Sequence, residues 1–325
     1  MNAPPPHARR ILLLSLLAIP AILIPVAGAW VAGGVVAAQA LYIGVVVTST
    51  AVRTLPEPRQ WAGAGWLAAA SAAGVLIGDR LPPLLLAVAL CCVAQLPFIR
   101  SDARAMAVTP AILVLWAGSP PSAGTPVAAA LVAVATFVGG ALMIAVAHLA
   151  RLPSQGRALP LPAAIRHGAL LAVGCCAVVL LTRLLGFERT GWGLIAFCLV
   201  FLPASDTLRT AFRYAAATAC GAVIAVTIAV AAPGAVQLTA ALLGALLTVW
   251  SSLGERSALS VAAIAATVTL LGSFAPEAQP AALGLERAGT ALLAVAVALA
   301  LTAADHGVES LLTRRHRARA TRATP

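Results

Sequence analysis

The chain has 325 residues, of which 61% are hydrophobic and 10% are charged. A typical soluble domain carries about 25% charged residues, so this composition excludes a sizeable soluble domain and predicts an all-α membrane protein. All 21 basic residues are arginines, the formal net charge is +11, and no aromatic side chains alternate with the charges for base stacking, so we expect no nucleic-acid binding.

Long apolar segments follow one another along the chain. About 20 residues at 1.5 Å per residue cross the roughly 30 Å of a bilayer's hydrocarbon core. We therefore expect about 12 transmembrane helices. In chain order they are Ile11 to Gly28, Trp30 to Ala51, Trp61 to Gly78, Leu81 to Phe98, Ala105 to Gly118, Pro126 to Leu149, His167 to Gly186, Gly191 to Thr207, Thr210 to Ala231, Ala235 to Leu253, Ser257 to Phe274 and Leu283 to Ala304.

Arginines alternate between successive turns of this arrangement. With the N-terminus in the cytoplasm, 17 arginines fall inside and 4 outside, as the positive-inside rule requires. The outer four are Arg80, Arg183, Arg189 and Arg287. The pattern predicts a multi-pass protein of the bacterial inner membrane with both termini in the cytoplasm and a basic tail held against anionic lipid headgroups.

The two halves of the chain share several landmarks. Trp30 corresponds to Trp192, and Asp102 corresponds to Glu255, each acid lying in a turn beside an arginine. Six helices per half give both halves the same orientation, which predicts two parallel repeats; chance similarity in a sequence rich in Ala, Val and Leu is the alternative. The expected parts are a first six-helix repeat at residues 1–150, a short cytoplasmic linker at 151–166, a second six-helix repeat at 167–306, and the basic cytoplasmic tail at 307–325.

Three charged residues form the strongest candidate for a substrate or ion pathway. Asp206, Arg209 and Arg213 share one helical face at spacings of three, four and seven residues. The apolar part of the preceding helix is short, and Pro203 can open its backbone, as in the broken helices that bind ions or anionic substrates. The alternative is a cytoplasmic loop whose arginines fix the topology.

Polar side chains also interrupt the second predicted helix. Gln39 lies near its centre, and Tyr42 follows one turn later. We interpret both as candidates for lining a substrate path, and hydrogen bonding between helices explains them equally.

Motifs for catalysis, nucleotide binding and metal binding are missing from the sequence. Without lysine there is no phosphate-binding loop of the G-x-x-x-x-G-K-[ST] type, and the five histidines lack metalloenzyme spacing. The six cysteines lie in apolar runs without a C-x-x-C motif. We therefore predict that the protein is not an enzyme and uses neither a cofactor nor a metal.

The second half resembles the fusaric acid resistance family of bacterial inner-membrane exporters, which includes aromatic carboxylic acid efflux pumps. The resemblance covers roughly residues 160–310, and it departs from the family in having Ala217 before Thr218 and in lacking a large cytoplasmic region between the halves. The residues that carry it are Arg166, Trp192, Pro203, Thr207-Leu208-Arg209, Arg213, Thr218, Gly221 and Glu286-Arg287-Ala288-Gly289-Thr290. The resemblance implies a proton-driven pump that works with a periplasmic adaptor of the membrane-fusion type.

Together these observations favour an efflux permease for small amphipathic organic anions such as aromatic carboxylic acids. Arg209 and Arg213 are expected to attract the anion, because a guanidinium can pair bidentately with a carboxylate. Asp206 is the expected proton-coupled partner, and Trp192 is a further candidate on the pathway. The competing hypothesis is a membrane scaffold or assembly subunit that transports nothing, and homo-oligomerisation is left open by the sequence.

Overall fold

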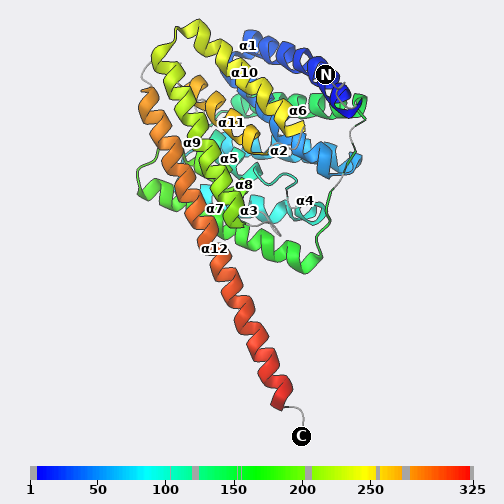
Figure 1. Ribbon diagram of the computed structural model, residues 1–325, viewed down its shortest axis with the longest axis vertical. Coiled ribbons are helices and arrows are strands. Elements are labelled where there is room, and N and C mark those ends of the chain that lie inside the picture. The colour runs from blue at the N-terminus through cyan, green and yellow to red at the C-terminus, as the bar shows by residue number, and fades with distance from the viewer. Residues whose placement is uncertain are drawn as a thin grey trace, which may run out of the picture.

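The computed structural model describes residues 6–102, 104–118, 124–151, 153–154, 156–201, 207–253, 257–272 and 279–322. Within these ranges the regular structure is α-helical throughout (Figure 1). The helices are α1 (Pro6–Thr54), α2 (Glu57–Ile77), α3 (Leu81–Ala94), α4 (Leu96–Ser101), α5 (Thr109–Ala117), α6 (Pro126–Leu149), α7 (Leu161–Leu184), α8 (Thr190–Val200), α9 (Thr207–Ala231), α10 (Gly234–Leu253), α11 (Ser257–Gly272) and α12 (Pro280–Arg322).

Within the part of the chain that the structure describes, seven helical stretches are long and apolar enough to cross a bilayer. They are Ile24–Thr54, Glu57–Ile77, Leu81–Ser101, Pro126–Leu149, Leu161–Leu184, Arg209–Ala231 and Pro280–His306. This confirms an all-α, multi-pass membrane protein. The predicted number of 12 spans is not confirmed, because α5 and α8 have 9 and 11 residues and extend over only about 14 and 17 Å. The two parallel repeats stay a prediction.

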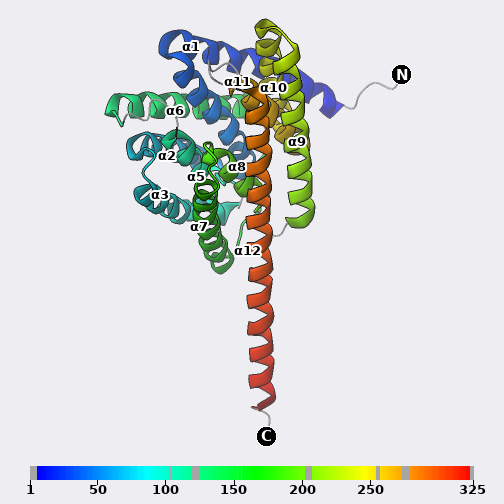
Figure 2. The same cartoon turned by 90° about the vertical axis from the view of Figure 1, so that its left-hand side faces the viewer.

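Several predicted helix ends were wrong. The first two predicted helices form one element, α1, whose kink lies at Gly34 with φ 69° and not at Ala29. A residue with a side chain rarely adopts this φ, so the second of two adjacent glycines takes the bend. The fourth predicted helix is divided at Gln95 into α3 and α4. At the other end of the chain, α12 continues to Arg322 and projects beyond the other helices (Figures 1 and 2).

Small residues let the helices of each half approach closely. A Cβ atom added at Gly44 of α1 would lie 2.1 Å from the Thr136 carbonyl oxygen of α6, and one added at Gly139 of α6 would lie 2.0 Å from the Leu41 carbonyl oxygen. In the second half, α9 runs beside α12 in both views (Figures 1 and 2), and Gly221 of α9 contacts the backbone of α11. Such contacts replace the hydrophobic driving force that helices lack in lipid.

The short helices α5 and α8 pack against each other between the halves. A Cβ atom at Gly191 of α8 would lie 3.0 Å from Leu115 Cα of α5, and Gly74 of α2 lies against the Leu113 backbone on α5. One buried cluster joins residues of α3 and α5 to residues of α7, α8, α9 and α12, so the first half and the second half share a core.

Among the described residues, five pairs of acidic and basic side chains are found, and one of them, Glu57 with His148, is an ion pair only when the imidazole is protonated. At one end of the molecule, Asp79 pairs with Arg183 and Glu286 pairs with Arg189. The other three pairs are Asp102 with Arg104, Glu57 with His148, and Asp305 with Arg166. Each pair joins two residues that the alternation of arginines places on the same side of the membrane, so the arrangement of these charges agrees with the predicted order of turns.

Asp102 fastens the linker between the halves to the first half. Its carboxylate accepts hydrogen bonds from the Arg104 backbone (2.8 Å), the Arg104 guanidinium (3.2 and 3.1 Å) and the Arg157 backbone (2.9 Å). Burial by itself raises the pKa of the Asp102 carboxyl, but these hydrogen bonds outweigh burial and hold the pKa below its ordinary value. The carboxylate therefore stabilises the fold at neutral pH.

Replacing Asp102 should loosen the linker in a pH-dependent manner. Asp102→Asn removes charge-assisted hydrogen bonds, which contribute roughly 1.5–3 kcal/mol each, so the detergent-solubilised variant should melt a few degrees below the wild type at pH 7. Because the folded-state pKa is depressed, this contribution is present above the unfolded-state pKa of about 3.9 and is lost as the pH falls through the folded-state pKa.

Melting curves of both proteins between pH 7 and pH 3 check this prediction. The difference between them should close at the acidic end, and a difference that persists or grows there would contradict it. Asp79→Asn is the matched control, because Asp79 pairs with Arg183 at an exposed position where an ion pair contributes about 0–1 kcal/mol.

Candidate functional site

An arginine is buried inside the second half of the molecule. Arg287 lies on α12, within the apolar stretch Pro280–His306, and only 2% of its surface is exposed. A charge at such a position costs at least about 2.5 kcal/mol, and charges inside membrane-spanning segments therefore mark functional sites by default.

The indole of Trp192 forms one wall around this arginine. Trp192 is buried near the start of α8, and the Arg287 Cζ atom lies 5.2 Å from the centre of its ring. The guanidinium of Arg189 contacts the same ring at 4.7 Å. Cation–π contacts contribute up to about 2 kcal/mol when they are desolvated, so the indole offsets part of the cost of burying Arg287.

Glu286, the acidic residue that precedes Arg287, forms its contacts with Arg189. One carboxylate oxygen of Glu286 accepts a hydrogen bond from the Arg189 backbone nitrogen at 2.7 Å, and the other lies 3.7 Å from the Arg189 guanidinium. These contacts fix the start of α8 against α12. In the part of the chain that the structure describes, Nε and Nη1 of Arg287 have no hydrogen-bond partner.

A tyrosine from α9 completes the surroundings. The Tyr214 side chain is buried, and its phenol lies within electrostatic range of the Arg287 guanidinium. Three helices that meet at a common core, α8, α9 and α12, thus provide an indole, a phenol and a cation. Each unpartnered nitrogen of Arg287 can donate a charge-assisted hydrogen bond to an anionic oxygen. The arrangement therefore suits an anion with an aromatic or apolar body.

The structure separates the residues that the sequence proposed for the pathway. Arg209 and Arg213 both lie exposed on α9, and Asp206 lies outside the described residues. Gln39 is exposed on α1, whereas the buried Tyr42 hydroxyl faces Thr248 of α10. Trp192, a further candidate, packs against Arg287.

Sequence reasoning missed Arg287 as a site residue. The sequence indicated it as one of the outer arginines and as part of the segment Glu286-Arg287-Ala288-Gly289-Thr290 that resembles the exporter family. The sequence did not show that α8 is too short to span the membrane and that it lies alongside α12. This packing covers the Arg287 side chain with Trp192 of α8. A charged residue seven positions after the start of an apolar helix was the available signal.

Two of the cysteines lie in contact between α7 and α8. Cys175 and Cys198 lie with their sulfur atoms 3.8 Å apart between α7 and α8, and they are free thiols. Among the described residues, no group of three or more His, Cys, Asp and Glu side chains is placed to bind a metal.

If Arg287 serves to bind an anion and not to stabilise the fold, replacing it with an uncharged residue should not lower the stability of the protein. Arg287→Met replaces an incompletely partnered cation by an apolar side chain of similar length, and such exchanges are often neutral or stabilising. The variant should therefore melt at the same temperature as the wild type or higher. Arg189→Met is the matched control: it faces the same indole but loses the ion pair with Glu286, so it should melt lower. A larger loss for Arg287→Met than for Arg189→Met would contradict this interpretation.

Comparison with known proteins places part of the chain in a family. Residues 175–301 match the family model described as fusaric acid resistance protein-like. The same comparisons found no match among curated proteins or among solved structures. The matched segment contains Trp192, Tyr214 and Arg287, and such a family indicates a membrane transporter of the efflux type rather than an enzyme. The family resemblance predicted from the motifs is thereby confirmed: residues 175–301 of this multi-pass membrane protein are similar to the fusaric acid resistance protein-like family.

Proposed function

We propose that the protein is an inner-membrane efflux permease for small amphipathic organic anions, such as aromatic carboxylic acids, and that Arg287 holds the anion during passage. The observation that carries this proposal is the fully buried guanidinium whose Nε and Nη1 have no partner among the described residues. Its position inside the segment that matches the family adds support.

The surroundings of Arg287 favour a carboxylate attached to an aromatic body. A bound carboxylate neutralises the buried cation and provides acceptors for the two nitrogens, whereas a neutral ligand does neither. The rings of Trp192 and Tyr214 offer aromatic surface beside the charge. Offset or edge-to-face contact between aromatic rings contributes about 0.5–1.5 kcal/mol beyond burial.

The exposed arginines of α9 have a role at the cytoplasmic entrance. Arg209 and Arg213 lie one turn apart near the start of this helix, where they raise the local concentration of anions before these enter the core. Asp206 precedes them in the sequence and is the proposed proton-coupled partner of the export step.

The wider arrangement follows from the same proposal. Both termini lie in the cytoplasm, and the basic end of the chain binds anionic lipid. The 12 helices of the two parallel repeats surround the path, and a periplasmic adaptor of the membrane-fusion type receives the exported anion.

Transport assays with Arg287 variants test the proposal. Purified protein in liposomes, energised by a pH gradient, should move benzoate and naphthoate, and Arg287→Gln should lower the rate at least about tenfold because a charge-assisted contact to the anion is lost. Arg183→Gln is the control, since Arg183 is a half-buried arginine that is already paired with the exposed Asp79, and it should transport normally. Equal rates for Arg287→Gln and the wild type would remove Arg287 from the pathway, and an inactive wild type would favour a membrane scaffold.

A second set of variants tests the cytoplasmic entrance separately. Export by cells that carry the wild type, Arg209→Ala or Asp206→Asn should be compared at equal protein levels. We expect Arg209→Ala to slow export at low ionic strength more than at high ionic strength, because salt screens the attraction of the exposed charge. Asp206→Asn should uncouple export from the pH gradient. Unaltered export in both variants would eliminate this entrance while leaving the role of Arg287 intact.

A further inference from the structure

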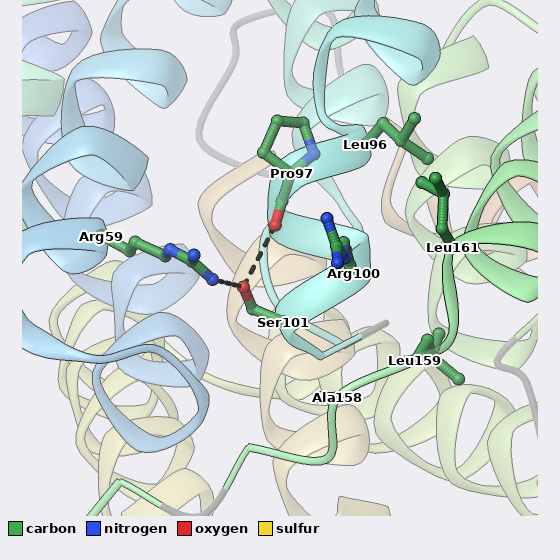
Figure 3. A pocket seen from close by; sticks show the side chains of 8 residues that line it. All are labelled: Arg59, Leu96, Pro97, Arg100, Ser101, Ala158, Leu159 and Leu161. Atoms are coloured by element: carbon green, nitrogen blue, oxygen red, sulfur yellow. Dashed lines mark hydrogen bonds between the residues drawn. The ribbon is translucent and has the colours of Figure 1, made fainter.

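A cavity of about 540 Å³ lies at the end of the molecule opposite Glu286 and Arg189, close to the Asp102 cluster (Figure 3). This volume is within the range of about 300–1,000 Å³ that small-molecule sites occupy. The start of α2, the helix α4, the linker and the start of α7 supply its walls. The lining residues are Arg59, Leu96, Pro97, Arg100, Ser101, Ala158, Leu159 and Leu161.

One side of this cavity is cationic. Arg59 reaches across from α2, and its Nη1 donates a hydrogen bond to Ser101 Oγ, which in turn donates to the Pro97 carbonyl oxygen at 3.1 Å. Arg100 projects from α4 between Ser101 and the leucines (Figure 3). Among the described residues its side chain makes no hydrogen bond or ion pair, and the nearby Asp102 carboxylate is already held by Arg104 and Arg157.

The other side of the cavity is apolar. Leu96, Leu159 and Leu161 lie on the side of Arg100 that faces away from Arg59 (Figure 3). The cavity is thus lined by two guanidinium groups on one side and by leucine side chains on the other. An amphipathic anion has the matching division, with its charge at one end and its apolar body at the other.

Residues 156–159 of the linker, which supply part of the wall, are fixed in place. The Leu159 backbone nitrogen donates to the Arg100 carbonyl oxygen at 2.9 Å, and the Arg157 backbone nitrogen donates to Asp102. Gly156 lies so close to the Thr54 carbonyl oxygen that an added Cβ atom would be 2.0 Å from it. A wall held by three backbone contacts needs little ordering when a ligand binds, which favours affinity.

We infer that this cavity is a second anion site, which binds amphipathic anions with the charged group between Arg59 and Arg100 and the apolar body against Leu96, Leu159 and Leu161. The ligand is either a soluble organic carboxylate or the headgroup region of an anionic phospholipid, since both combine one negative charge with apolar surface. The inference goes beyond export through Arg287, because it requires binding and not transport.

Binding to purified full-length protein tests the inference, with Arg287→Gln as the starting protein so that the buried site does not contribute. Naphthoate is titrated in neutral detergent and followed by its fluorescence, and retention of phosphatidylglycerol against phosphatidylcholine is measured in nanodiscs. We expect at least one of these two anions to bind. Adding Arg100→Gln should weaken that binding at least about tenfold, because a charge-assisted contact is lost, and neutral naphthamide should not bind.

Arg80→Gln is the matched control, because Arg80 is an exposed arginine at the start of α3 and lies outside the cavity; it should leave binding unchanged. Leu159→Ser tests the apolar wall, and it should weaken naphthoate and phosphatidylglycerol alike. Binding of naphthoate alone identifies a soluble ligand, and binding of phosphatidylglycerol alone identifies a lipid.

The inference is overturned if neither anion binds, or if both bind equally well with and without Arg100. A protein that binds naphthoate at this cavity but does not transport it would refute the proposed export function alone. Transport that depends on Arg287 but not on Arg100, without binding at the cavity, would refute the second site alone.

Discussion

The hydrocarbon core of a bilayer offers no hydrogen-bond partners to a polypeptide backbone, and this constraint determines most of the structure. Each unsatisfied N–H or C=O group costs several kcal/mol there, so the chain crosses as α-helices. Short or broken elements are tolerated only where protein surrounds them. The helices α5 and α8 satisfy this condition, because their residues are almost all buried between longer helices. The glycines that let helix backbones touch, such as Gly74 and Gly191, make room for them.

The same low-dielectric interior explains why Arg287 is informative. An arginine in a membrane-spanning helix is expensive, at about 2.5 kcal/mol or more at the centre of the helix, and the contact with Trp192 recovers about 2 kcal/mol of such a cost when it is desolvated. The adjacent acid could have reduced the cost further, but Glu286 is paired with Arg189 instead. The fold therefore retains a cation that stability alone does not require. The anionic ligand that we propose would supply the missing compensation when it binds.

Features that depend on a short stretch of sequence could be predicted, whereas features that depend on contacts between distant segments could not. The apolar runs are local, and they correctly predicted an all-α membrane protein. The alternation of arginines is local too, and the side of the membrane that it assigns to each turn stays a prediction. The family resemblance also came from local motifs. The sequence predicted a break between two helices at Ala29, whereas the kink of α1 lies at Gly34. Gly28, Gly33 and Gly34 all allow the backbone conformation of such a kink, so the sequence alone does not select among them.

The candidate site was less predictable, because it joins distant segments. Trp192 and Arg287 are far apart in the sequence, and their contact requires the packing of α8 against α12. Arg209 and Arg213 were correctly placed on one helix, but spacing alone could not show that both side chains are exposed. The cavity between Arg59 and Arg100 depends on a linker whose course is fixed by contacts with Asp102 and Thr54, and no pattern in the sequence specifies those contacts.

The choice of arginine at both sites limits how transport can be coupled to protons. A guanidinium stays protonated at every physiological pH, so Arg287, Arg59 and Arg100 can hold an anion but cannot release it by losing a proton. Release must come from a competing charge or from a change in geometry. Glu286 is adjacent to Arg287 in the chain, and its hydrogen bond to the Arg189 backbone nitrogen holds the start of α8, which carries Trp192, against α12. The pairing of Glu286 with Arg189 therefore sets the position of α8, and through it the contact between Trp192 and the arginine that is proposed to bind the anion.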